Sequence, residues 1–324
     1  MKRHFLRIAA LTAVATALCA AAPPPFSPYE MIVMQAAKAG AETLPDLPGT
    51  GPYAAIKEMD PSLPDHVIYR PRDIDAVGQH KLGIMLWGNG GCSADGASAR
   101  NHLLEIASHG YLVIAPGHIY SGPGASPAPA RGDPRQMSVA TSAADVLAGL
   151  DWALAEAKKP ASRYYNRINP AMVAVAGHSC GGLQALQVAA DPRISAVIIH
   201  NSGMFVGDAQ LINGIVSDKA LLKKLHTPVL YVLGGPRDVA WPNGSDDFNR
   251  IDQVPAFLAE RQVGHGGTFA EPYGGSVAQV AVDWLEWQLR GDEAAGRTFT
   301  GPACRLCIAP EWTVRRKGLP AFTS

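Results

Sequence analysis

The chain has 324 residues, 47% of them apolar, and its 28 basic residues balance its 28 acidic ones. This length permits one large domain, or two ordinary ones, with a sizeable hydrophobic core. The balanced charge gives no electrostatic footprint for a nucleic acid or an anionic membrane surface. We therefore expect a small or neutral partner and no binding of nucleic acid.

The first residues predict an export signal. A basic stretch at 1–7 precedes a run of apolar and small residues, Ile8 to Ala22, which is followed by three prolines. The run is short for a membrane span, and prolines cannot continue a helix. We expect cleavage near Ala21 and an exported protein, periplasmic or extracellular, with no integral membrane segment. A lipoprotein cut before Cys19 is disfavoured by the bulky Leu18.

Four cysteines remain after such a cleavage: Cys92, Cys180, Cys304 and Cys307. An even number in an oxidising compartment suggests two disulfides, for which three connectivities are possible. Cys304 and Cys307 lie in a polar tail without the second CxxC or the histidine pair that a zinc site needs. A local bridge between them is favoured over zinc and over a redox pair.

Apolar runs alternate with helical patterns along most of the chain. Continuous apolar strands suit a sheet covered on both faces, and strands that alternate with helices predict a mostly parallel, doubly wound α/β fold. The predicted strands are 67–69, 82–87, 111–115, 172–176, 194–200, 229–233 and 254–259.

The helical patterns complete this organisation. Apolar stripes with the period of a helix predict one helix at about 138–159 and another around 277–285. The Gly- and Pro-rich stretch at 117–134 predicts a long loop over the carboxyl edge of the sheet, where doubly wound folds bind their ligands. We expect a signal peptide at 1–22, an extended arm at 23–65, one main domain at 66–295 and a wrapping tail at 296–324.

The pentapeptide Gly177-His178-Ser179-Cys180-Gly181 lies between the predicted strand 172–176 and a helix-forming run at 183–190. A G-x-S-x-G sequence at such a junction is typical of a nucleophile elbow, where the glycines let a sharp turn close. Ser179 is therefore the candidate nucleophile. Helix N-capping is the alternative role for this serine.

A serine nucleophile needs a base within hydrogen-bonding reach and an acid that orients the base. Asp238 follows the predicted strand 229–233, and His265 follows the strand 254–259. The order Ser179, Asp238, His265 is the one expected for an α/β-hydrolase.

Each partner has an alternative interpretation. Asp238 could be a turn residue or an ion-pair partner of Arg237, and two further carboxylates, Asp246 and Asp247, lie in the next helical stretch. We expect His178, beside the serine, to pack under the elbow. The histidines that compete with His265 are His109, His118, His200 and His226.

An acyl-transfer site also needs two N–H donors for the oxyanion. One would be the backbone N–H of Cys180, and the other that of Asn89, or as second choice Gly90, in a glycine-rich loop at 87–92. This loop lacks the sequence of a phosphate-binding loop. Both segments carry a cysteine, so we hypothesise a Cys92–Cys180 bridge that fixes the donors; a buried free Cys180 with Cys92 on the surface is the alternative.

These motifs together resemble those of secreted serine α/β-hydrolases, in the branch of dienelactone-hydrolase-like proteins, chlorophyllase-type esterases and cutinase-like polyester hydrolases. The resemblance covers about 67–290. Two departures are that Ser179 stands where dienelactone hydrolases use cysteine, and that Trp87 replaces the usual histidine of the oxyanion loop. No long lid insertion, as in a true lipase, is visible.

The resemblance implies an α/β-hydrolase fold without a large lid domain, and a carboxylesterase-like enzyme that acts on a small-molecule or polymeric ester through an acyl-enzyme intermediate. No metal or organic cofactor is expected. An acyltransferase or a peptidase with the same triad, and a catalytically silent binding protein, are the alternatives.

Several aromatic or large residues lie near predicted strand ends and could line a substrate pocket, although ordinary loop packing is the alternative for each. They are Trp87, Tyr120, Met204, Phe205 and Trp241.

Overall fold

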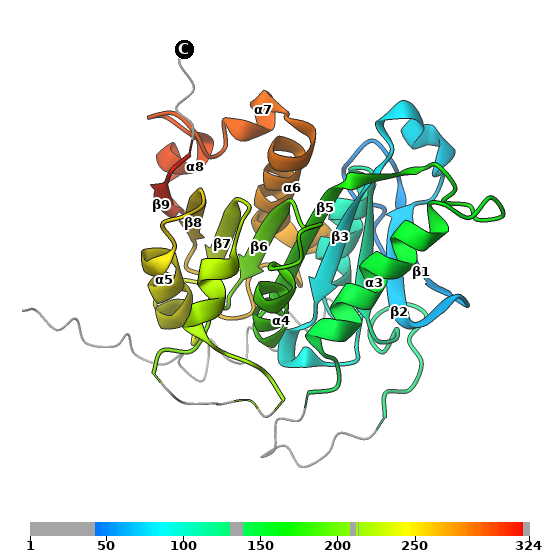
Figure 1. Cartoon of the computed structure of the whole chain (residues 1–324), viewed down its shortest axis with the longest axis horizontal. Helices are drawn as coiled ribbons and strands as arrows, with labels where there is room; N and C mark the ends of the chain where they lie inside the picture. The colour runs from blue at the N-terminus through cyan, green and yellow to red at the C-terminus, as the bar shows by residue number, and fades with distance from the viewer. Residues whose placement is uncertain (1–42, 130–138, 208–211, 213, 320–324) are drawn as a thin grey trace, which may run out of the picture.

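The computed structural model describes residues 43–129, 139–207, 212 and 214–319. In this part of the chain, nine strands form one sheet with the order β1-β2-β4-β3-β5-β6-β7-β8-β9 (Figure 1). The run from β4 to β8 is parallel, whereas β1, β2 and β9 pair antiparallel at the two edges. The strands are β1 Ala55–Asp60, β2 Leu63–Pro71, β3 Leu82–Gly88, β4 Tyr111–Pro116, β5 Ile168–His178, β6 Ala196–His200, β7 Val229–Leu233, β8 Ala256–Glu260 and β9 Thr313–Lys317.

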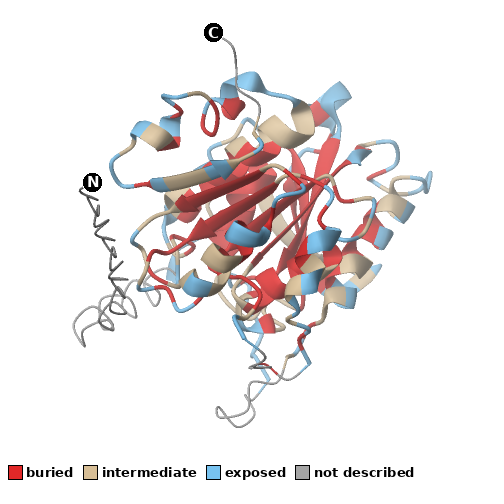
Figure 2. Ribbon diagram, turned by 60° about the vertical axis from the view of Figure 1, so that its left-hand side comes forward, coloured by how far each residue is buried: buried red, intermediate tan, exposed pale blue. Residues whose placement is uncertain are grey.

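Helices cover both faces of this sheet. Apolar residues of α3 and α4 join one buried cluster, and those of α2 and α6 join a second cluster on the opposite face. Figure 2 shows the buried strands between these two layers. The helices are α2 Arg100–Ser108, α3 Ala143–Glu156, α4 Cys180–Val188, α5 Trp241–Arg250, α6 Gly275–Arg290, α7 Glu293–Gly296 and α8 Arg305–Ile308, with 3-10 turns η1 Asp75–His80, η2 Gly90–Cys92, η3 Lys219–Lys224 and η4 Pro272–Gly274.

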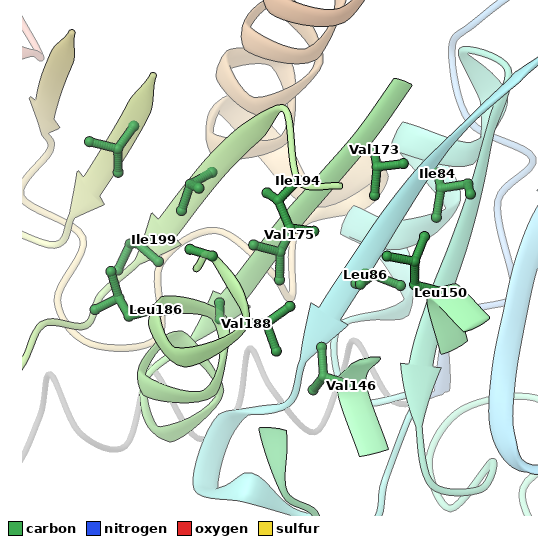
Figure 3. Packing of buried hydrophobic residues seen from close by; sticks show 14 of the residues in the cluster. Ile84, Leu86, Val146, Leu150, Val173, Val175, Leu186, Val188, Ile194 and Ile199 are labelled. Carbon is green, nitrogen blue, oxygen red and sulfur yellow. The ribbon is translucent and has the colours of Figure 1, made fainter. Parts of the chain in front are cut away.

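The alternation of side chains along β3 shows how the sheet serves both layers. Ile84 and Leu86 point to the cluster under α3 and α4, where they lie near Val146 and Leu150 of α3 (Figure 3). Trp87, on the other face of the strand, belongs to the cluster under α2 and α6. Successive residues of a strand point to opposite faces, so one strand contributes to both clusters.

The predicted α/β class, with a mostly parallel sheet, is confirmed. Every predicted strand lies wholly or partly within an observed one, and the two predicted helices correspond to α3 and α6. The described residues of the predicted loop, 117–129, contain no helix or strand of the sheet. The predicted signal peptide lies outside the described residues.

The two ends of the described chain differ from the predicted arm and tail. Residues 55–60, assigned to an extended arm, form the edge strand β1, and residues 313–317 of the tail form the opposite edge strand, β9. The arm before β1 lies along α2, where Thr50 donates its backbone N–H to Glu105 Oε2 at 2.8 Å. Both terminal segments therefore extend or brace the sheet itself.

Candidate active site

Ser179 occupies the turn between β5 and α4. Its backbone has φ 53° and ψ −122°, a conformation that L-residues rarely adopt, and its side chain makes no capping hydrogen bond to α4. A Cβ added at Gly177 would lie 2.2 Å from the carbonyl oxygen of Gly181, and one added at Gly181 would lie 2.1 Å from the backbone of Gly88. Only glycine fits these positions, and the turn holds the Ser179 hydroxyl away from its own helix.

Three residues distant in sequence meet at this turn. His265 Nε2 lies 2.8 Å from Ser179 Oγ, and His265 Nδ1 lies 2.6 Å from Asp238 Oδ1. Asp238 follows β7 and His265 follows β8, so both loops leave the carboxyl ends of parallel strands beside β5 and β6. The sheet therefore brings together the three residues that the sequence order predicts.

The carboxylate of Asp238 is buried and well supplied with donors. Oδ1 also accepts the N–H of Ala240 at 2.9 Å, while Oδ2 accepts the N–H of Gly234 at 3.2 Å and the amide of Asn201 at 2.9 Å. Burial by itself would raise the pKa of Asp238, but the hydrogen bond from His265 and the other donors hold that pKa below its ordinary value. The carboxylate is thus ionised and fixed in orientation.

The competing carboxylates have other roles. Asp247 is fully buried and binds Lys219 Nζ at 2.6 Å, and Asp246 binds the same ammonium at 2.7 Å. Both lie on α5 and anchor the segment that follows β6.

The competing histidines lie in other environments. His109 lies 3.2 Å from Glu105 and His118 lies 3.4 Å from Asp65, whereas His226 is exposed. His200 has no exposed surface. Among these candidates, His265 is the one placed at hydrogen-bonding distance from Ser179.

The glycine-rich loop at 87–92 lies directly against the elbow. Cys92 and Cys180 form the hypothesised disulfide across 88 residues, which joins η2 to the first residue of α4. A Cβ at Gly181 would lie 2.6 Å from the backbone nitrogen of Asn89. The side-chain amide of Asn89 donates to Ser93 O at 2.9 Å, within its own loop, and to Pro116 O at 2.7 Å, at the end of β4.

Both donor choices, Asn89 and Gly90, therefore lie at the elbow. Cys180 begins α4, and the first N–H groups of a helix have no acceptor within the helix.

The second predicted disulfide, Cys304–Cys307, is also present.

His178 lies between the glycine-rich loop at 87–92 and the loop that carries His265. Its Nε2 lies 2.8 Å from the carbonyl oxygen of His265, and a Cβ added at Gly90 would lie 2.5 Å from its Nδ1. Burial, and then the charge that His265 can carry, lower the pKa of His178 to about 4. His178 is thus neutral near pH 7, and its Nε2–H donates to the carbonyl group.

A layer of buried rings lies behind the triad. Trp87, His102 and His200 have no exposed surface and pack around Phe269, with ring centroids 5.0–5.8 Å apart. Burial lowers the pKa of His102 to about 3 and that of His200 well below its ordinary value. The expectation that Trp87 lines a substrate pocket is wrong in this structure, because its side chain points to the α2 and α6 side of β3.

The other predicted lining residues divide by exposure. Met204 is fully buried, and its backbone is held by Asp247, so it offers no surface to a substrate. Tyr120, Phe205 and Trp241 are partly exposed, so their contact with a substrate stays a prediction.

Asn201 is a site residue that the sequence patterns do not single out. It directly follows β6, and its amide binds Asp238 and also the carbonyl oxygen of Gly264 at 3.0 Å. The sequence signal that could have identified Asn201 is its position directly after a buried strand. That strand, β6, lies between β5, which precedes Ser179, and β7, which precedes Asp238.

Comparison with models of protein families returns no match, and comparison with curated proteins returns none either. Within the described ranges, no group of three or more His, Cys, Asp and Glu side chains could hold a metal ion. None of the helices that the structure describes is long and apolar enough to cross a membrane.

Proposed function

We propose that this chain is a serine hydrolase of the α/β-hydrolase fold that cleaves carboxylic esters. The observation that carries the proposal is the hydrogen-bonded series Ser179 Oγ, His265 and Asp238, in which the serine occupies a strained turn between a strand and a helix. An oriented imidazole beside a serine hydroxyl is the arrangement that acyl transfer needs. The chain order of the triad and the glycine-rich loop after β3 also support this fold assignment.

In the proposed reaction, Ser179 Oγ bonds to the ester carbonyl carbon while its proton passes to His265 Nε2. Asp238 holds the imidazole by its Nδ1–H and stabilises the cationic form. The N–H groups of Cys180 and of Asn89 or Gly90 would donate to the oxyanion, an interaction for which losing one donor typically costs about 2.7–4 kcal/mol.

The second half of the reaction returns the enzyme to its starting state. His265 gives its proton to the leaving alcohol as the tetrahedral intermediate collapses to the acyl-enzyme. A water molecule then attacks the acyl carbon, His265 takes the proton of the water, and Ser179 recovers it as the acid leaves. This sequence requires no metal or organic cofactor.

We also propose that the protein is exported. Two disulfides suit an oxidising compartment, which agrees with the signal peptide predicted at 1–22. Transfer of the acyl group to another alcohol, or hydrolysis of a peptide bond, would use the same triad, so both the bond that is cleaved and the acceptor have to be measured.

The test is hydrolysis of p-nitrophenyl esters of increasing acyl length, beside aryl and sugar esters, by the wild-type protein and by Ser179→Ala. We expect Ser179→Ala to lower kcat by about 10⁴-fold or more, because removal of a triad nucleophile leaves only binding and oxyanion stabilisation. Ser195→Ala is the matched control, because Ser195 lies before β6 and donates to Ala171 O. Equal activity in the wild type and Ser179→Ala would overturn the proposal.

A further inference from the structure

The side chain of Asn201 lies at the centre of the connections between the acid and the base. Its backbone N–H donates to Val232 O of β7 at 2.8 Å, and the residue has φ 46°, in the left-handed region that asparagine tolerates better than most residues. Its side chain is only 1% exposed. The amide is therefore held rigidly at the carboxyl edge of the sheet.

Both hydrogens of the Asn201 amide are used within the candidate active site. Nδ2 donates to Asp238 Oδ2 at 2.9 Å and to Gly264 O at 3.0 Å. Gly264 directly precedes His265, so one amide group joins the loop of the acid to the loop of the base. Of the donors to the Asp238 carboxylate, Asn201 and His265 use their side chains, whereas Gly234 and Ala240 use backbone N–H groups.

The two loops approach too closely for a larger bridging group. A Cβ added at Gly234 would lie 2.0 Å from Gly264 O and 2.7 Å from Asn201 Nδ2, and Gly264 N donates to Gly234 O at 2.8 Å. A planar amide fits in this space and donates twice without bringing a charge. A lysine or arginine would neutralise Asp238 and weaken its effect on His265.

We propose that Asn201 is a positioning residue of the hydrolytic site, which orients the Asp238 carboxylate towards His265 and fixes the distance between the two loops. This inference rests on the proposed function. Asn201 does not touch Ser179 through any recorded contact, so its effect on catalysis would pass through Asp238 and His265.

Asn101 offers a matched control. It is also buried, at 4% exposure, and its Nδ2 donates to Ala270 O at 3.3 Å and to Glu271 O at 3.1 Å, further along the segment that carries His265. It has no recorded contact with Asp238. Asn101→Ala and Asn201→Ala each remove two amide hydrogen bonds from a buried site. Only Asn201→Ala removes a hydrogen bond to the Asp238 carboxylate.

We expect Asn201→Ala to lower kcat about 10- to 100-fold, the loss typical of a hydrogen bond to a charged group, with KM changed by about twofold or less. Asn201→Ser, which keeps one donor hydroxyl, should have an intermediate kcat. Asn101→Ala should lower the Tm by a similar amount yet keep the wild-type kcat. A wild-type kcat in both Asn201→Ala and Asn201→Ser would overturn the inference.

Asn201→Asp gives a readout that a purely structural role would not change. Two carboxylates about 3 Å apart cannot both be ionised, so at neutral pH the new side chain holds a proton and its O–H replaces the amide donor to Asp238 Oδ2. We expect kcat to stay within a few-fold of the wild-type value at low pH and to fall towards that of Asn201→Ala at higher pH, where this proton is lost. A kcat profile parallel to that of the wild type at every pH would contradict the inference.

NMR titration of the His265 ring in the wild type, Asn201→Asp and Asn201→Ala makes the test independent of turnover. A shifted titration together with an inactive wild type would support the positioning role and refute the hydrolase proposal. An unshifted titration in both variants of an active enzyme would refute the positioning role alone.

Discussion

Asp238 is the residue on which the geometry of the proposed site depends most. Four donors converge on its two oxygens, and they keep its pKa low in spite of burial. Because a carboxylate oxygen can only accept, Asp238 Oδ1 keeps His265 Nδ1 protonated and leaves Nε2 free to accept the proton of Ser179. The acid thus sets which tautomer of the base faces the nucleophile.

This role predicts the effect of Asp238→Asn. An amide can present an N–H to His265 Nδ1 and so favours the wrong tautomer, a change that costs about 10⁴-fold in kcat in related triads. We expect a loss of about 10³- to 10⁴-fold in ester hydrolysis, measured at saturating substrate.

Asp246→Asn is the matched control, because this carboxylate pairs with Lys219 and Arg250 on α5. It should retain the wild-type kcat. A comparable fall in both variants would mean that the loss reflects a weakened fold and that Asp238 has no special role.

The residues of the triad could be predicted because each follows a buried strand that is recognisable in the sequence. The burial of Trp87 could not be predicted, because it depends on the face of β3 to which the side chain points and on how α2 packs around it. The role of Asn201 arises only where the loops after β7 and β8 meet, a contact with no local sequence signature.

Among the elements, the link between η2 and α4 is the one closest to the proposed chemistry. The Cys92–Cys180 disulfide closes 88 residues and lies between the two segments that would provide the oxyanion donors. Gly88 of β3 pairs with Gly177 of β5 immediately before these segments. The donor spacing is therefore set by a strand pairing and a covalent bond together.

Replacing both cysteines of this bridge by serine should reduce stability and activity together. A closed loop of this length contributes about 4–5 kcal/mol in the chain-entropy model, and loss of the bridge also frees the oxyanion loop. We expect a large fall in Tm, and a kcat lowered about tenfold or more when it is measured well below that Tm.

The double serine variant of Cys304 and Cys307 is the control, since that bridge spans a separation of 3 residues in the tail. It should cost about 1–2 kcal/mol and leave kcat unchanged. An unaltered kcat in the folded Cys92/Cys180 variant would show that the bridge has no part in donor geometry.

The elements that the sequence patterns missed have weaker apolar patterns than the central strands and the long helices. β1 and β9 are edge strands with charged residues and only partial burial, so neither has the continuous apolar run of a central strand. α2 has only nine residues, and its four apolar residues, Leu103, Leu104, Ile106 and Ala107, are too few to establish a helical period. The central parallel strands have continuous apolar runs, so the sequence pattern could predict them.

For the whole molecule, buried histidines set how the free energy of unfolding depends on pH. Burial lowers the pKa of His102 to about 3 and that of His178 to about 4, and it also lowers the pKa of His200 well below its ordinary value. In the unfolded chain these groups bind protons with a pKa of about 6.5. Below that pH the unfolded state holds more protons, so stability falls as the pH falls.

Buried Asp247 opposes this trend, because burial raises its pKa to about 6 and the folded state then takes up a proton first. The unfolded state nevertheless gains protons at three histidines between pH 7 and pH 5, so we expect the free energy of unfolding to fall over this range. Urea unfolding at pH 7 and pH 5 measures the slope. His102→Phe, which keeps a ring in the layer, should reduce the slope by about one proton; an unchanged slope would contradict this assignment.

The central claim is that Ser179 is a nucleophile activated by His265 and Asp238. Incubation of the folded protein with a fluorophosphonate, followed by peptide mass mapping, tests this claim most directly, because the reagent forms a covalent adduct only with an activated serine. The account predicts one adduct, on Ser179, which is lost in Ser179→Ala and strongly slowed in Asp238→Asn. A folded wild-type protein without an adduct at Ser179 would contradict it.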